Sequence, residues 1–197
     1  MIIHGAGGHG LVVAESAGAA GFTIVGFVDD FAAEGYLGGQ PILKAEFVGA
    51  TDAELIVAIG DAGTRSRIHQ SYVESDRSMA IVVHPSATVS TSASLGPGVF
   101  VGPNAVVNAE AVVGDGVIVN SRAVVEHHCE VGRFSHVAPG ATLGGSAKVG
   151  HATLIGIGAS VLPGVVIGSS ATIGAGSVVR DNVADGQTVA GSPARPI

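Results

Sequence analysis

The chain is poor in several residue types, and each shortage narrows the classes of protein to which it can belong. It has 197 residues but one cysteine and no tryptophan, and charged residues make up 13%. One cysteine cannot form an internal disulfide, which favours a reducing cytoplasmic location. No stretch approaches the roughly 18 consecutive apolar residues of a membrane span, and the amino terminus lacks the basic segment of a signal peptide. The net charge of −7 argues against a nucleic-acid partner.

Glycine and small aliphatic residues are abundant, and charge is unevenly spread. There are 31 glycines, and hydrophobic residues make up 47% of the chain. Residues 1–79 hold 4 basic and 10 acidic residues, whereas residues 80–197 hold 5 and 6. The amino-acid composition changes at the same point. We therefore predict two parts, a domain over 1–79 and a second domain with a carboxyl-terminal tail over 80–197.

The second part is a repeat with a period of six residues. From Val83 to Val179 every sixth residue is aliphatic, for 17 consecutive positions, and the residue four positions later is always small or β-branched. A period of six fits neither an amphipathic helix nor a single strand. It predicts a solenoid of short strands and tight turns, whose aliphatic side chains stack inside.

The segment VEHHCE, residues 125–130, combines two histidines with the only cysteine. In the repeat, Val125 and Cys129 occupy inward positions, so we expect Cys129 to fill space as a small buried residue and not to act as a nucleophile. Glu126, His127 and His128 fall on outward or corner positions. In a repeat with so little charge, this cluster favours a functional site over an ordinary polar surface.

The first part is typical of a small α/β unit. Strands are expected at 1–4, 22–30, 54–61 and 80–84, and helices at 8–21, where Gly21 ends the helix, and 64–75. Residues 5–10, GAGGHG, match the G-x-G-x-x-G fingerprint between a strand and a helix, and Asp29 follows at the expected distance. The part is too short for two mononucleotide-binding halves, so it is suited to one nucleotide. A glycine turn that only packs the helix onto the strand remains the alternative.

Together the two parts resemble one family over the whole chain. The motifs are GAGGHG, VDDF, AIGD with Arg65, EHHCEVGRFSHVAPGATLGG and the tail VAGSPAR. They are similar to those of bacterial nucleotide-sugar acetyltransferases, which include enzymes that N-acetylate UDP-4-amino sugars on the way to bacillosamine, GDP-perosamine N-acetyltransferases and proteins labelled sialic acid O-acetyltransferases. The resemblance implies a half-Rossmann α/β domain followed by a left-handed parallel β-helix, the fold of hexapeptide-repeat transferases.

The resemblance also implies a division of labour. The amino-terminal domain would hold the nucleotide of the acceptor, and the β-helix would hold acetyl-CoA between neighbouring subunits of a homotrimer, with no metal. The catalytic base would be His127. The residues implied to contact acetyl-CoA are His136, Ile157 and Ala175. Those implied or expected to bind the nucleotide sugar are Gly7, Gly8, His9, Asp29, Asp30, Gly60 and, as an added phosphate ligand, Arg65.

One position departs from the family. Its members usually carry Glu or Asp directly after the catalytic histidine, whereas this chain has His128. Either Glu126, Glu130 or a group from another subunit then orients His127, or His127 is less basic than its counterpart in relatives. His127 and His136 are nine residues apart, half of an 18-residue coil, so they should lie on different sides of one subunit.

We predict direct transfer of an acetyl group from acetyl-CoA to the amino group of a nucleotide-linked amino sugar, with His127 as the general base. An O-acetyltransferase of the same fold and a non-catalytic nucleotide-sugar-binding protein remain alternatives. A trimeric zinc carbonic anhydrase of the β-helix type would need histidines five residues apart, and the repeat contains no such pair.

Overall fold

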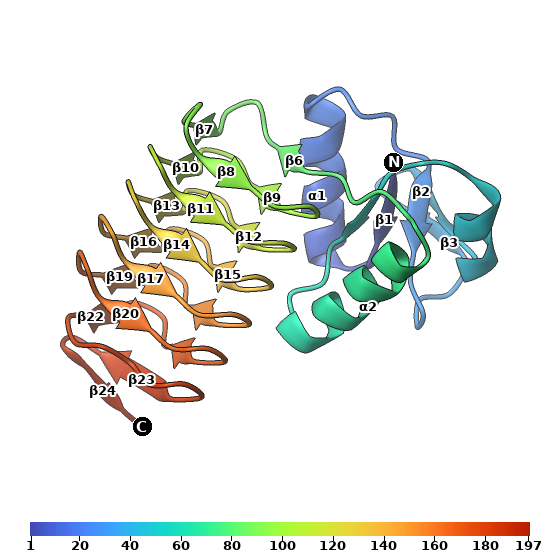
Figure 1. Ribbon diagram of the computed structural model, residues 1–197. Coiled ribbons are helices and arrows are strands. Elements are labelled where there is room, and N and C mark those ends of the chain that lie inside the picture. Colours follow the sequence, from blue (N-terminus) through green and yellow to red (C-terminus); the bar gives the residue numbers. More distant parts are fainter.

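The computed structural model describes residues 1–197 and shows two domains side by side, a small α/β domain and a stack of coils (Figure 1). The α/β domain holds a five-stranded sheet in the order β3-β4-β2-β1-β5. The strands are β1 Ile2–His4, β2 Gly26–Val28, β3 Gly35–Leu37, β4 Gln40–Leu43 and β5 Leu55–Val57. All neighbours pair in parallel except β3, which is antiparallel to β4.

Two α-helices follow β1 and β5, which are adjacent strands of this sheet. Helix α1 spans Gly8–Ala19 and α2 spans Ala62–Glu74, with a short 3₁₀ helix, η1, at Ala45–Ala50. The side chain of Asp61 accepts a hydrogen bond from the Thr64 N–H and so caps α2. The predicted strands and helices exist but the strands are shorter than predicted, and the β3–β4 hairpin and η1 were missed.

The second domain is a left-handed parallel β-helix with three strand stacks. Its 17 two-residue strands are β6 Val82–Val83, β7 Thr88–Val89, β8 Ser94–Leu95, β9 Phe100–Val101, β10 Val106–Val107, β11 Val112–Val113, β12 Ile118–Val119, β13 Val124–Val125, β14 Glu130–Val131, β15 His136–Val137, β16 Thr142–Leu143, β17 Lys148–Val149, β18 Leu154–Ile155, β19 Ser160–Val161, β20 Val166–Ile167, β21 Thr172–Ile173 and β22 Val178–Val179. The tail adds β23 Thr188–Gly191 and β24 Ala194–Pro196, a hairpin that covers the last coil.

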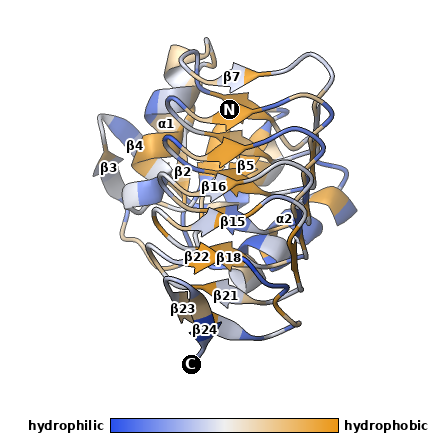
Figure 2. Ribbon diagram, turned by 90° about the vertical axis from the view of Figure 1, so that its left-hand side faces the viewer, coloured by the Kyte–Doolittle hydropathy of each residue, from blue (hydrophilic) through white to orange (hydrophobic).

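The register of the coils confirms the repeat. Val107 pairs with Val125, and Val113 pairs with Val131, each 18 residues later, so three hexapeptides make one coil. The aliphatic residues form one continuous core, which includes Cys129 with no exposed surface. Hydrophobic colour follows the strands in Figure 2, whereas the turns and α2 carry much of the hydrophilic colour. The prediction that Val125 and Cys129 point inward is confirmed.

An apolar contact joins the two domains. The strand stack that contains β6, β9, β12 and β15 faces α1. Phe100 and Ile118, from β9 and β12, share a buried cluster with Val13 and Ala17 of α1. The α/β domain therefore packs on the first coils of the β-helix, and the end of the β1–α1 loop lies against them. The domain boundary at 79/80 stays a prediction.

Candidate active site

The four glycines of residues 5–10 have two different environments. A Cβ on Gly10 would lie 2.0 Å from the Gly5 carbonyl oxygen, and Gly5 itself has a φ of +118°. These two glycines are therefore required by the close packing of α1 onto the loop. A Cβ on Gly7 or Gly8 would meet no atom within 4 Å. The middle glycines thus leave open space at the start of α1, which a purely structural turn does not need.

A first cavity, which we call the glycine-loop cavity, opens at the carboxyl ends of β1, β2 and β5. It has a volume of about 360 Å³. Its lining residues are His4, Gly5, Gly7, His9, Asp29, Asp30, Phe31, Ala58, Ile59, Gly60, Thr64, Arg67 and Ile68. This is the edge of a parallel sheet at which α/β proteins bind ligands. The structure thus brings together five of the predicted nucleotide-binding residues, while Gly8 lies beside the cavity without lining it.

The two aspartates at the end of β2 have different surroundings. Asp29 accepts hydrogen bonds from the backbone N–H groups of Ala6, Phe31 and Ala32, at 2.8 to 3.0 Å. Although burial opposes it, this N–H donation lowers the pKa of Asp29. Asp29 therefore shapes the glycine loop. Asp30 has a half-exposed carboxylate, 3.9 Å from Nε2 of His4, and remains available to a ligand.

The structure corrects the interpretation of Arg65 as a phosphate ligand. Its side chain is 1% exposed and does not line the glycine-loop cavity. The guanidinium donates only to backbone carbonyls, because α2 directs it inward toward the β-helix and not toward the glycine loop. Two residues along, Arg67 is exposed and lines the cavity. Only Arg65 was considered from the sequence. Both arginines follow the AIGD motif on α2, and their positions around the helix decide that Arg67 faces the glycine-loop cavity.

A second cavity, the interdomain cleft, lies between the start of α2 and the β-helix. Its volume is about 600 Å³. Its lining residues are Gly60, Asp61, Ala62, His136, Ala138, Pro139, Ala152, Thr153, Leu154, Gly156, Ile157, Thr172, Ile173, Gly174 and Ala175. His136, Ile157 and Ala175, three residues from three successive coils, therefore share one cleft. Gly60 lines both cavities.

Two imidazoles meet where the cavities adjoin. The rings of His9 and His136 are stacked with their centroids 6.4 Å apart. Burial, followed by the nearby charge of Arg65, lowers the pKa of both rings to about 4. The Asn120 Nδ2 amide lies 3.0 Å from His136 Nε2, so His136 accepts there and is neutral at physiological pH. Asn120 was not identified from the sequence. This residue directly follows β12, the strand that pairs with β15, so its contact with His136 depends on how the coils stack.

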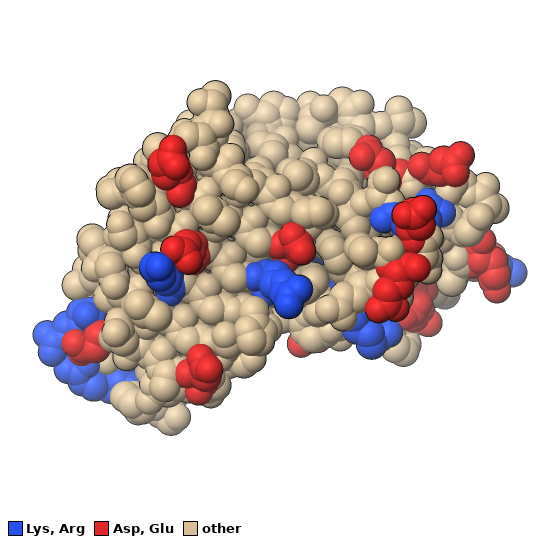
Figure 3. All heavy atoms as spheres, in the orientation of Figure 1, with Lys and Arg blue, Asp and Glu red and all other residues tan.

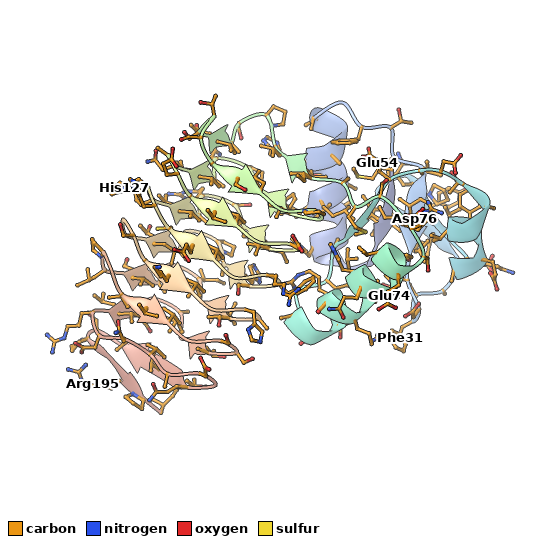
Figure 4. The ribbon with its side chains drawn as sticks, viewed as in Figure 1. Phe31, Glu54, Glu74, Asp76, His127 and Arg195 are labelled. Carbon is orange, nitrogen blue, oxygen red and sulfur yellow. The ribbon has the colours of Figure 1, made fainter.

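His127 stands at a different corner of the β-helix, in the turn between β13 and β14. Figure 4 shows it at the margin remote from the α/β domain. It lines neither cavity. The strands β13 and β14 belong to the two other stacks, whereas β15, which carries His136, belongs to the stack that faces the α/β domain. The prediction that His127 and His136 lie on different sides of one subunit is confirmed.

The surroundings of His127 show which neighbour can orient it. Its Nδ1 lies 3.0 Å from the Nδ1 of His128. Glu126 instead accepts from the His127 backbone N–H at 3.3 Å and from the Asn108 side chain at 3.0 Å. Glu130 forms an ion pair with Lys148. Neither Glu126 nor Glu130 therefore orients the imidazole of His127; His128 contacts it, and Glu126 holds the backbone of His127.

His128 stands in a left-handed turn, with a φ of 58°. Glu110 occupies the equivalent turn one coil earlier with the same φ of 58°. A glutamate is therefore compatible with this backbone, and the histidine at 128 is not imposed by the turn.

No three His, Cys, Asp or Glu side chains are close enough together to hold a metal ion. No helix is both long and apolar enough to cross a membrane.

Both domains match known families. The PglD N-terminal domain matches residues 1–72, and the bacterial transferase hexapeptide (six repeats) matches residues 110–145 and 146–181. No curated protein sequence matches the chain significantly. Among solved structures, a variant of perosamine N-acetyltransferase from Caulobacter crescentus, in complex with CoA and GDP-perosamine, is 35% identical with a TM-score of 0.96; the match covers 100% of this chain and 95% of that one.

A second solved relative is the acetyltransferase domain of PglB from Neisseria gonorrhoeae FA1090 in complex with acetyl coenzyme A. It is 39% identical, with a TM-score of 0.95, and the match covers 100% of this chain and 98% of that one. The two matched domains define a hexapeptide-repeat transferase with a PglD-type amino-terminal domain. At these identities over its whole length, the chain belongs to the bacterial nucleotide-sugar acetyltransferase family.

Proposed function

We propose that this protein transfers the acetyl group of acetyl-CoA to the amino group of a nucleotide-linked amino sugar. The observation that carries the proposal is the pair of adjoining cavities. One is built on a glycine loop at a sheet edge, the other holds His136, Ile157 and Ala175, and both share Gly60. The relatives solved with CoA, acetyl-CoA and GDP-perosamine support the same pairing of substrates.

In this proposal the nucleotide occupies the glycine-loop cavity. The free N–H groups at the start of α1 and the open space over Gly7 and Gly8 suit a diphosphate. Arg67 adds a positive charge and Asp30 offers a carboxylate to sugar or base hydroxyl and N–H groups. Because the surrounding domain is acidic, phosphate affinity depends on these local groups and not on the overall field.

The interdomain cleft then holds acetyl-CoA. Its walls are mostly small or apolar residues, and Ile157 is 62% exposed, which leaves apolar surface for a pantetheine arm. His136 is kept neutral by its buried surroundings, and because its Nε2 accepts from Asn120, its Nδ1–H is left to donate a hydrogen bond there without adding charge. No residue in either cavity is a nucleophile suited to carry the acetyl group, so we propose direct transfer.

In the proposed chemical step, His127 is the general base. The amine nitrogen of the sugar attacks the thioester carbonyl carbon, Nε2 of His127 takes one amine proton, and the C–S bond breaks to release the coenzyme A thiolate. The proton on the imidazolium then neutralises the thiolate. When His127 Nδ1–H donates to Nδ1 of His128, Nε2 of His127 is left as the free acceptor. His128 thus takes over the orienting contact of the family carboxylate without its charge.

Because His127 lies away from both cavities of its own chain, we propose that the site is completed by His127 of a second copy in a homotrimer. A trimer places each corner of one β-helix beside the neighbour's, and an isolated chain would then be inactive. The single cysteine and the use of acetyl-CoA favour a cytoplasmic enzyme.

The proposal is tested by measuring coenzyme A release from acetyl-CoA in the presence of amino-sugar nucleotides. A thermal-shift screen of UDP-, GDP- and CMP-sugars selects the nucleotide first, since a ligand at 100 times its Kd stabilises by about 2.7 kcal/mol. Release with the 4-amino sugar but not with its 4-hydroxy counterpart supports N-acetylation. Release with the hydroxy sugar alone identifies an O-acetyltransferase, and binding without release identifies a non-catalytic binding protein.

A further inference from the structure

Arg65 is the only buried residue among the lysines, arginines, aspartates and glutamates. No carboxylate forms an ion pair with it. Burial lowers the pKa of Arg65 to about 10, so it keeps its charge at neutral pH. A buried cation is costly unless it is hydrogen-bonded throughout. Such a residue needs an explanation that the binding of a ligand does not provide, because the guanidinium contacts no cavity.

The hydrogen bonds of Arg65 join backbone segments of the two domains. Nη1 donates to the carbonyls of Ile59 at 2.6 Å and Gly60 at 2.8 Å. Nε donates to the Gly116 carbonyl at 2.8 Å, and Nη2 donates to the carbonyls of Phe134 and Ser135. The first pair of carbonyls belongs to the α/β domain, and the other three belong to two successive coils of the β-helix.

The backbone segments on both sides of Arg65 adjoin the proposed site. Gly60 lines both the glycine-loop cavity and the interdomain cleft, so the turn that follows β5 is a partition between them. Ser135 directly precedes His136, which lies in the interdomain cleft beside His9. One guanidinium therefore fixes the partition of the α/β domain relative to the histidine of the β-helix.

We propose that Arg65 is a positioning residue that sets the geometry of both substrate cavities at once. This inference rests on the proposed assignment of the nucleotide and acetyl-CoA to the two cavities. Since the partition is common to them, its displacement changes both binding sites. The flat guanidinium has five donors and can reach carbonyls of both domains, whereas an ammonium can reach those of only one domain well. Lysine is therefore a poor substitute despite its charge.

The test compares Arg65→Met and Arg65→Lys with Arg77→Met. Arg77 is a matched control, because its guanidinium also donates to two backbone carbonyls, those of Val48 and Ala53, but both lie within the α/β domain and outside the cavities. The Kd of CoA alone and of UDP or GDP alone is measured by calorimetry, and circular dichroism establishes that each variant is folded. Arg65→Lys serves as the conservative variant if Arg65→Met does not fold.

We expect Arg65→Met to raise both Kd values by about tenfold or more, since small displacements of a site are costly, and Arg65→Lys to raise both by less. Arg77→Met should lower the melting temperature and leave both Kd values unchanged. Loss of nucleotide affinity alone would make Arg65 a phosphate ligand and overturn the proposal. A lower melting temperature with both Kd values unchanged in the Arg65 variants would show a purely structural role and also overturn it.

A second readout follows the His136 imidazole by NMR. Arg65 is the second cause, after burial, of the low pKa of His136, so Arg65→Met should raise that pKa from about 4. An unchanged value would place the guanidinium elsewhere and contradict the geometry. These readouts need no turnover. Wild-type protein that binds both ligands but releases no coenzyme A would contradict the proposed reaction and leave the role of Arg65 decidable.

Discussion

The α/β domain and the β-helix differ in how they place functional side chains. The β-helix repeats one small inward pattern, and its corners, spaced 18 residues apart, present single residues at regular positions such as Glu110, His128 and Ser146. The α/β domain gathers its cavity from the ends of several strands and the starts of two helices. It also holds most of the acidic residues, which cluster over that side in Figure 3.

The difference explains why the proposed site would need both domains. The β-helix offers a regular scaffold with little net charge, and its coils supply most of the small and apolar lining of the interdomain cleft, which suits a flexible thioester arm. The sheet edge offers loop N–H groups and a few charged side chains, which suit a polar nucleotide. Arg65 connects the two, and His127 remains outside both cavities. The following predictions test whether the two domains have the separate roles described here.

The largest expected effect is on the chemical step. His127→Ala should lower turnover by about 10²- to 10⁴-fold, the usual contribution of a positioned general base, and should hardly change the Kd of acetyl-CoA. Steady-state kinetics and calorimetry measure the two quantities. His128→Ala is the control, since it removes a neighbour of the base and should cost much less. Full activity in His127→Ala with an inactive His128→Ala would mean that the other histidine is the base.

A second prediction concerns acid stability at the domain contact. His9 and His136 have folded pKa values of about 4, below the ordinary 6.5, so the unfolded chain binds more protons between these values. Stability is therefore fully present above pH ~6.5 and falls as pH decreases toward 4, by up to about 1.4 kcal/mol per pH unit for each histidine. Urea unfolding at pH 7 and pH 5 measures this. A His9→Gln/His136→Gln double variant should show a weaker decrease; an equal decrease would contradict the assignment.

A third prediction separates nucleotide binding from acetyl-CoA binding. Gly7→Val should raise the KM of the nucleotide sugar about tenfold, because its side chain would fill open space in the glycine-loop cavity, and should leave the KM of acetyl-CoA nearly unchanged. Gly18→Val, at the other end of α1, is a matched control, since a Cβ there also meets no atom within 4 Å. Equal increases in both KM values would mean that the two cavities do not bind separate substrates.

The smallest expected effect is at Cys129. Burial raises the pKa of its thiol, and its side chain is fully enclosed in the β-helix core. Cys129→Ala should leave turnover unchanged, because alanine occupies the equivalent inward position at Ala111 and Ala147 in the neighbouring coils. Steady-state rates check this. A large loss of turnover with unchanged melting temperature would give the thiol a chemical role.

The sequence predicted the β-helix in detail and the α/β domain only in outline. A core position that recurs every six residues leaves little freedom, so the short strands and the burial of Cys129 were predicted correctly. The coil of 18 residues, which the resemblance implied, is also observed. In the α/β domain the β3–β4 hairpin was missed, because short strands around glycines carry no periodic signal. Arg65 was assigned to the wrong surface since a motif gives spacing but not the side of α2 that faces the β-helix. Asn120 was missed because its contact with His136 spans one coil.

The central claim is that a catalytic site needs His127 from one chain and the two cavities from another. Mixing tests it most directly: His127→Ala and Gly7→Val/Ile157→Arg variants, each inactive alone, are unfolded, combined and refolded together, and coenzyme A release is measured. In mixed assemblies some sites pair an intact His127 with intact cavities, so a substantial fraction of wild-type activity should return, and it should depend on the mixing ratio. Activity that stays at the level of the separate variants, with mixed assemblies verified by mass spectrometry, would contradict a site shared between chains.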